Sequence, residues 1–477
     1  MNTSIKGSRS LDEVNLENMT IGSKIENEIS DELQIDTTGE DPINSKVKNY
    51  NKYQVPHADD PSRFPDGGKE AYIILLGTFF GFAGLLAFVN SMGVFENYIS
   101  SHILPDTPIS SIGWIFSVYS FFSFGGTLVG GPVFDKIGCR IPLIVGIILT
   151  MIGFMCMSIS TKVWHFILSF SICGGIGTAC TFSSFLGVVT HYFLLKRGRA
   201  IGLGYTGGAI SGLLFPIMFR SLFPKLGFGW SIRIGAFICL GLLIIATLMV
   251  KDRHIEFQKD QLDRDDHVIK QILNSFDFKI FNSRVYCCLV LALLGNGFAF
   301  LVSATYLPSY ATTFGHSASN SYLLLTVFNT LSIPGRLVPA WLADKYGRFN
   351  SLCLISLLST FAFFIIWVNR PVGHTLGGLF AFAAVFGFSS GSVLSLTPVV
   401  IGQICSVEQI GKYTGTAFFV LAFGDLVGIP IGGAITNSRT RESFDWLVIF
   451  VALCSVCGTI GSFTARYIYA GINLKRV

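Results

Sequence analysis

The sequence predicts an all-α membrane protein in which twelve transmembrane helices form two pseudo-symmetric six-helix bundles. The first observation is composition: of 477 residues, 51% are hydrophobic and 13% are charged, with a mean hydropathy of +0.58. Soluble domains carry about 25% charged residues, so a soluble globule is excluded, and a nucleic-acid role does not fit despite the net charge of +5. The second is a series of twelve apolar segments, and the third is an internal repeat.

The apolar segments are each close to the roughly 20 residues that a spanning helix needs. We place them, in order, at 71–95, 112–133, 141–160, 164–190, 200–220, 231–250, 285–310, 320–343, 351–369, 375–400, 411–435 and 444–470. The first six make an N-terminal bundle over 71–250, and the last six make a C-terminal bundle over 285–470. A polar linker at 251–284 joins the bundles, and 471–477 form a short tail.

The first 70 residues are a separate segment. Residues 1–70 hold fourteen acidic and eight basic residues and no apolar core of signal-peptide length. Low hydrophobicity and many charges are typical of a disordered tail. Four apolar residues spaced four apart also allow a short amphipathic helix, namely Ile21, Ile25, Ile29 and Leu33.

The loops predict the orientation of the chain. Those on one side of the membrane hold fifteen Lys and Arg residues, and those on the other side hold seven. Cytoplasmic loops carry the excess of positive charge. We therefore expect both termini in the cytoplasm, with the plasma membrane as the location and the vacuolar membrane as the alternative.

A short motif recurs at the same place in each bundle. Its members are Gly131, Asp135, Lys136, Gly138 and Arg140 in the first bundle and Asp344, Lys345, Gly347 and Arg348 in the second. Asp344 follows Asp135 after 209 residues, and Tyr413-Thr414-Gly415 follows Tyr205-Thr206-Gly207 after 208. Two features that recur after nearly the same number of residues indicate parallel repeats, from which several transporter folds are built.

Both motif carboxylates are predicted at the end of a span, where they can face the N-terminus of a neighbouring helix. Free N–H groups and the partial positive charge of a helix start favour an anion. We expect each of the two carboxylates to face such a helix start. The motif glycines permit tight turns and close helix approach. The alternative is that both carboxylates are solvated loop charges.

Residues before the first and fifth spans resemble a known family. They are Asp66, Gly67, Gly68, Tyr192, Phe193, Lys196 and Arg197. With the duplicated motif, they resemble the monocarboxylate-porter family of the major facilitator superfamily, and Asn90 to Tyr98 resembles its fungal branch, which includes a riboflavin transporter. The resemblance implies a major facilitator fold with alternating access. It also implies that spans one, four, seven and ten line the solute path and that spans two, five, eight and eleven form the moving interface. The duplicated motif would be a conformational gate that holds the outward-open state through contacts between the halves, with Asp135 near Gly411 at the start of the eleventh span and Asp344 near Ala200 at the start of the fifth.

The chain departs from proton-linked members of that family at two positions. Asn90 stands where they carry Lys, and Ser332 stands where they carry Asp, whereas Arg336 matches their Arg. These departures favour a larger, polar and weakly anionic or neutral solute over lactate-type acids. The resemblance to the fungal branch makes a riboflavin-like compound the leading example. The alternatives are a monocarboxylate transporter, with or without proton coupling, that anchors its solute at Arg336, and a non-transporting nutrient sensor that signals through its tail.

Five polar residues within spans are candidates for contact with a solute or coupling ion. Arg336 lies about 12 Å inside its span, and a charge at such depth is functional by default. It either contacts the solute or pairs with Asp425, which in turn either accepts a coupling proton or forms that pair. Asn90 and Asn296, with Tyr119 as a weaker candidate, bind a polar solute or tie helices together.

Several classes of protein are not supported by the sequence. The eleven Cys residues show no zinc spacing, and no nucleophile–base constellation or Gly-Lys-Ser/Thr phosphate loop occurs. We therefore expect no enzyme, no ATP-driven pump, no cofactor and no metal site. The expected partners are a small organic solute, protons in the coupled alternative, and the lipid bilayer.

Overall fold

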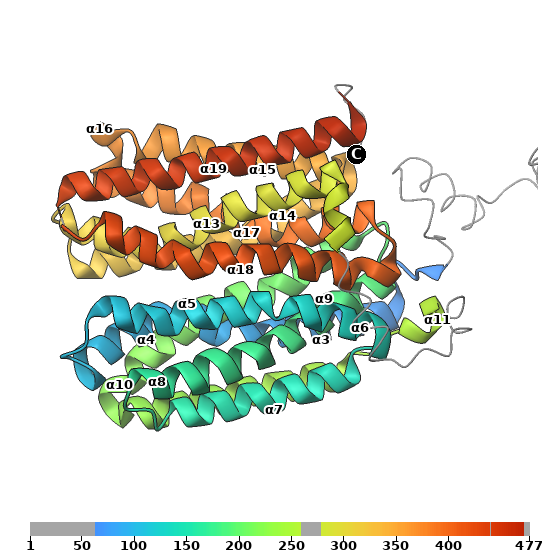
Figure 1. Cartoon of the computed structure of the whole chain (residues 1–477), viewed down its shortest axis with the longest axis horizontal. Coiled ribbons are helices and arrows are strands. Elements are labelled where there is room, and N and C mark those ends of the chain that lie inside the picture. Colours follow the sequence, from blue (N-terminus) through green and yellow to red (C-terminus); the bar gives the residue numbers. More distant parts are fainter. Residues whose placement is uncertain (1–62, 259–277, 439, 472–477) are drawn as a thin grey trace, which may run out of the picture. The chain divides into compact units, whose positions relative to one another are not determined.

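The computed structural model describes residues 63–258, 278–438 and 440–471 (Figure 1). The helices of the first bundle are α3 (Gly68–Val89), α4 (Met92–Tyr98), η2 (Ile99–Ile103), α5 (Ile109–Gly125), α6 (Thr127–Ile137), α7 (Arg140–Met157), α8 (Val163–Phe166), η3 (Ile167–Gly174), α9 (Gly175–Tyr192) and α10 (Arg197–Met249). The helices α11 (His254–Gln258) and η5 (Phe278–Asn282) belong to the predicted linker. Most of that linker, most of the predicted acidic tail and 472–477 lie outside the described residues.

The second bundle contains the remaining helices. Its helices are α13 (Arg284–Thr313), α14 (Ala318–Tyr346), α15 (Arg348–Phe361), η6 (Ala362–Trp367), α16 (Arg370–Gly373), α17 (Leu376–Ile404), η7 (Val407–Gln409), α18 (Ile410–Ile435) and α19 (Arg441–Ala470). In Figure 1 the blue-to-green helices and the yellow-to-red helices form two groups. The described part of the chain contains eleven helices long and apolar enough to cross a membrane.

Helix α10 contains two of the twelve predicted spans. At about 1.5 Å per residue, its 53 residues are too long for one crossing of a bilayer core roughly 30 Å thick. Gly227 has φ +70° and breaks the helix. The chain turns back there, because Gly204 before the break and Met249 after it lie next to neighbouring residues of α3, Thr78 and Gly77. The predicted loop between spans five and six is thus corrected to a sharp break at one glycine.

The buried apolar clusters show which ends of the bundles touch. One cluster holds only first-bundle residues, such as Phe95 and Phe219, and another holds only second-bundle residues, such as Phe382. The third cluster combines the two, for example Tyr205 with Ala340. The bundles therefore pack against each other at the end that carries the duplicated motif.

Four helices of the second bundle are capped by their own N-terminal side chains, whereas α10 and α18, which begin where the bundles meet, are not. Four second-bundle helices begin at a Ser or Thr whose hydroxyl accepts a backbone N–H three residues on, at Ser283, Ser317, Thr375 and Thr440. Such caps satisfy one of the free N–H groups of a helix start. The residues preceding α10 and α18, Lys196 and Gln409, make no such bond. Their caps come from the opposite bundle.

Candidate functional site

Asp135 caps helix α18 from the first bundle. One carboxylate oxygen accepts the N–H of Gly411 at 3.2 Å, and the other accepts the N–H of Lys412 at 2.9 Å. The side chain is buried, and the helix start favours its negative charge. Asp135 thus lies at the start of the eleventh span, as the resemblance implies.

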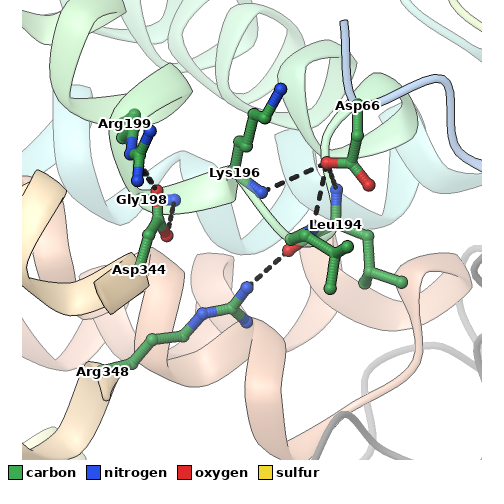
Figure 2. Close-up of polar contacts among 8 residues, drawn as sticks. Asp66, Leu194, Lys196, Gly198, Arg199, Asp344 and Arg348 are labelled. Carbon is green, nitrogen blue, oxygen red and sulfur yellow. Dashed lines mark hydrogen bonds and ion pairs between the residues drawn. The ribbon is translucent and has the colours of Figure 1, made fainter. Parts of the chain in front are cut away.

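Asp344 makes the equivalent contact from the second bundle. Its oxygens accept the N–H groups of Gly198 and Arg199, both at 2.9 Å, and the Arg199 guanidinium lies 3.6 Å away (Figure 2). These residues form the first turn of α10, directly before the predicted partner Ala200. Asp344 is 3% exposed, so the alternative of solvated loop charges is contradicted for both carboxylates.

Glycines shape the turns and the close approach at these contacts. A Cβ atom at Gly131 would lie 2.1 Å from the carbonyl oxygen of Gly411, so a larger residue would force α6 and α18 apart. Gly138 and Gly347 follow the helices that carry the carboxylates, with φ of +83° and +110°. Such positive φ values favour glycine. The three glycines therefore lie where the predicted turns and approach require them.

The basic residues of the motif are not all at the contact between the bundles. Lys345 is exposed, and its Nζ lies 5.0 Å from the ring centroid of Trp341 and 5.2 Å from that of Tyr346. Arg140 is also exposed, whereas Lys136 is half-buried. Lys345 and Arg140 are thus exposed rather than buried between the bundles, and long cationic side chains in such positions can reach polar surroundings.

Asp66 binds the loop that leads into α10. Its Oδ1 accepts three consecutive backbone N–H groups, those of residues 194–196, at 2.9, 3.0 and 3.1 Å (Figure 2). Asp66 has φ +50°, and Gly67 and Gly68 have φ +154° and +89°, which explains the two glycines after the aspartate. The segment before the first span therefore holds the loop directly ahead of the turn that Asp344 caps.

Two arginines bind backbone carbonyls across the halves. Arg348 Nη2 donates to the carbonyl of Leu194 at 2.5 Å, and Arg197 Nη1 donates to the carbonyl of Gly402 at 2.7 Å. Gly402 follows Leu194 after 208 residues, the offset of the repeat, so the carbonyls are equivalent. The arginines are not, because Cys139 stands 209 residues before Arg348. Arg197 therefore makes, from a different position, the contact that the motif arginine makes in the other half.

A cavity of about 1040 Å³ lies between the bundles at the end opposite these contacts. Its wall extends from Arg336 and Tyr205 to the exposed residues Asn97, Ser101 and Ser309. Spans one, five, seven, eight and eleven supply most of the wall, and spans four and ten supply one residue each. Spans one and seven line the cavity as the resemblance implies, but spans four and ten contribute little, and spans two, five, eight and eleven, which were expected at the moving interface, also contribute to the wall.

Arg336 and Asp425 both line the cavity without forming the ion pair considered above. Arg336 Nη1 donates to the carbonyl of Tyr205 at 2.6 Å, and its buried Nε has no hydrogen-bond partner. Asp425 is 4% exposed, and within the described residues no hydrogen bond or ion pair joins it to Arg336. Both groups keep bonding capacity toward the cavity.

Of the three uncharged candidates for solute contact, one lines the cavity and two do not. Asn90 lines the cavity while its Nδ2 donates to a backbone carbonyl of α10 at 2.9 Å. Asn296 lies outside the cavity wall, with its Nδ2 3.5 Å from Ser356 Oγ. Tyr119 is fully buried, with its hydroxyl 2.8 Å from Thr178 Oγ1. Asn296 and Tyr119 are therefore corrected from solute candidates to interhelical contacts.

Glu96 is a cavity residue that the sequence reasoning missed. It lies on α4, is half-buried and lines the cavity. The first span was predicted to end at residue 95, but the helical path continues through α4 and η2 to Ile103. A carboxylate inside a span is a functional candidate by default, so the correct end of the span would have identified Glu96.

Comparisons with known proteins agree with this architecture. A family model described as Major Facilitator Superfamily matches residues 71–372, and one described as Sugar (and other) transporter matches 285–467. Riboflavin transporter MCH5 of Saccharomyces cerevisiae is 38% identical over 425 residues, covering 87% of this chain and 81% of that protein. The aspyridones efflux protein apdF of Emericella nidulans is 31% identical over 432 residues, covering 89% and 84%.

Solved structures share the fold at low sequence identity. The proton:xylose symporter XylE matches with a TM-score of 0.66 and 14% identity, over 84% of this chain and 96% of that one. The E. coli fucose:proton symporter FucP matches with a TM-score of 0.62 and 16% identity, over 83% and 98%. Two helical bundles around a solute cavity define a multi-pass secondary transporter of a small solute. The chain belongs to the Major Facilitator Superfamily, and the predicted fold is confirmed.

The Arg197 contact predicts a loss of transport that a second substitution repairs. We expect Arg197→Ala to lower the initial uptake rate by about tenfold or more, since a hydrogen bond from a charged donor contributes roughly 1.5–3 kcal/mol. Cys139→Arg in the same chain should restore part of the rate by placing a guanidinium at the repeat-equivalent position. The initial rate of solute uptake, divided by the amount of the protein in the membrane, measures both the loss and the recovery. Lys345→Ala, which removes an exposed side chain, is the control. Unchanged uptake in Arg197→Ala would contradict the assignment.

Proposed function

We propose that this transporter carries a flat, polar, riboflavin-like solute across a fungal plasma membrane, as a member of the monocarboxylate-porter family with both termini in the cytoplasm. The observation that carries the proposal is the cavity: it is large, and its inner wall combines aromatic rings with one buried guanidinium, that of Arg336. Asn90 lies in the same wall, where proton-linked relatives of the resembled family carry Lys. The likeness to a transporter named for riboflavin supports the same solute class.

In this proposal the contacts of Asp135 and Asp344 form the gate. Each carboxylate binds the start of a helix in the opposite bundle, so both sets of bonds must break when the bundles rock apart at that end. The cavity is lined by exposed residues at the other end. With cytoplasmic termini, this conformation is outward-open, and the gate closes the cytoplasmic side.

One observation favours a second candidate, a monocarboxylate transporter. Arg336 faces the cavity and forms no ion pair with Asp425, so a solute carboxylate could take a bidentate place on its guanidinium. The absence of Lys at position 90 and of Asp at position 332 counts against this candidate. A non-transporting sensor is the candidate from another class, and it predicts altered signalling without flux.

Initial-rate uptake of labelled riboflavin, with lactate in parallel, tests the proposal. The chain is expressed in yeast cells that lack their own carriers for both solutes. We expect saturable riboflavin uptake and no lactate uptake above that of cells without the chain. Lactate uptake without riboflavin uptake would establish the second candidate, and flux of neither solute from a protein shown at the cell surface would refute the riboflavin assignment.

A further inference from the structure

The cavity is mainly aromatic near Arg336, and near the exposed end it combines polar side chains with further rings, among them Tyr98, Phe223 and Tyr306. Four rings from four helices line the inner part near Arg336, namely Phe124, Phe182, Tyr205 and Phe418. Ring centroids of Phe418 lie 5.7 Å from Phe124 and 5.4 Å from Phe182, so these rings form one continuous patch. Polar side chains line the part near the exposed end, namely Glu96, Asn97, Ser100, Ser101, Thr305 and Ser309.

Arg336 and Asp425, which do not form an ion pair with each other, lie at different depths in the cavity. Arg336 precedes Asp344 by eight residues, and Asp425 follows Gly411 by fourteen. At 1.5 Å per residue, they lie about 12 Å and about 21 Å along their helices from the gate. Asp425 is therefore about 9 Å nearer the exposed end than Arg336. A solute that reaches both groups must be elongated.

The chemistry of the two groups gives the solute a direction. The guanidinium has only donors and binds carbonyl or anionic oxygens, and the carboxylate has only acceptors and binds hydroxyl or amine hydrogens. Arg336 lies beside the aromatic patch, which suits a flat ring, whereas Asp425 lies toward the polar part. Asp425 is also buried, and among the described residues it has no hydrogen-bond or ion-pair partner. A buried polar group in a membrane span is costly unless something bonds it.

We infer that the cavity binds a planar heterocycle with its carbonyl edge at Arg336 and its polyhydroxyl chain at Asp425, pointing toward the exposed end. The inference rests on the proposed function and assigns the orientation and the second recognition group of the same solute. A riboflavin-like molecule has both parts, a dioxo ring system and a ribityl chain. The ring takes the aromatic patch, and the chain hydroxyls donate to the Asp425 carboxylate.

This arrangement also selects against a related solute. A chain that ends in a phosphate would bring its negative charge past Asp425 toward Glu96, and like charges repel most strongly where water is scarce. The Asp425 carboxylate therefore favours the neutral polyol over its 5′-phosphate, against the attraction of Arg220 and His102, which line the same part of the cavity. Asp425 acts as a specificity-determining residue in both respects.

Competition against labelled riboflavin uptake tests the assignment with three probes: riboflavin, lumiflavin, which has a methyl group in place of the ribityl chain, and riboflavin 5′-phosphate. Asp425→Ala should raise the inhibition constant of riboflavin by about tenfold or more, the effect of losing a hydrogen bond to a charged group. The constant of lumiflavin should change by less than about twofold. Arg336→Lys should weaken both ring compounds alike.

Asp425→Asn provides the second measurement, because the amide keeps the shape and one acceptor oxygen but removes the charge. It should improve binding of riboflavin 5′-phosphate relative to riboflavin by about tenfold. Glu442→Gln, an exposed carboxylate at the start of α19, is the matched control. Equal weakening of riboflavin and lumiflavin in Asp425→Ala, or no change in either, would overturn the inference while riboflavin uptake stands. Absence of riboflavin uptake in the unmodified chain would instead refute the proposed function together with the inference.

Discussion

Replacing Arg336 by Ala should lower riboflavin uptake at least about a hundredfold. The Arg336 guanidinium donates to the Tyr205 carbonyl of the opposite bundle, and Arg336 lines the cavity. Loss of two hydrogen bonds from a charged donor, each contributing roughly 1.5–3 kcal/mol, accounts for an effect of this size. Arg336→Lys should show an intermediate rate, because an ammonium keeps the charge but not the planar fork of donors.

Initial rates per copy of surface protein measure this effect. Arg441→Ala, which removes an exposed arginine at the outer end of α19, is the matched control and should leave the rate within about twofold of the unmodified chain. If Arg336→Ala transports normally while correctly located, Arg336 neither holds the solute nor links the bundles in a way that transport needs.

Replacing either gate carboxylate by its amide should shift the protein away from the conformation described above. Asp135→Asn and Asp344→Asn each keep one acceptor oxygen but lose the charge that two helix N–H groups bind. A loss of about 2 kcal/mol would change the ratio of the two conformations by roughly thirtyfold. Transport falls with it, because the gate must close as well as open.

Thiol labelling detects this shift independently of transport. Asn329 lines the cavity. A cysteine introduced at this position should react more slowly with a membrane-impermeant reagent added outside when the chain also carries Asp135→Asn or Asp344→Asn. The chain without the Asn329→Cys change gives the background from the native cysteines, and Asp106→Asn, an exposed loop carboxylate, is the control. Unchanged labelling in both gate variants would show that these bonds do not set the conformational balance.

The positions of the gate carboxylates could be predicted because two local signals coincide. The repeat offset places Asp135 and Asp344 at equivalent helix ends, and a helix start binds an anion whatever the surrounding sequence. The prediction for Asp344 named Ala200, and the partners are Gly198 and Arg199, a difference that reflects the uncertain start of an apolar helix. The contact of Arg197 with Gly402 could not be foreseen, because it joins segments that only tertiary packing brings together.

The sequence of a uniformly apolar span does not predict which of its residues point toward the cavity and which toward neighbouring helices. Asn296 lies outside the cavity wall, while its neighbour Gly297 lines the cavity, since each residue turns about 100° around a helix axis. In a soluble helix the apolar stripe would fix that rotation, but in a membrane span both faces are apolar. The same reasoning explains Tyr119, which packs inside the first bundle. The depth of a residue within its span, in contrast, follows from counting residues along the helix, and this count predicted the position of Arg336.

Counterflow in vesicles tests the central claim, transport by alternating access through one cavity, most directly. The purified chain is reconstituted into lipid vesicles preloaded with unlabelled riboflavin, and labelled riboflavin is added outside without ATP or an ion gradient. The account predicts saturable entry that internal riboflavin accelerates, with a transient internal excess of label, and predicts that Asp135→Asn and Arg336→Ala abolish it. Entry that rises linearly with concentration and is indifferent to internal riboflavin would contradict a gated carrier.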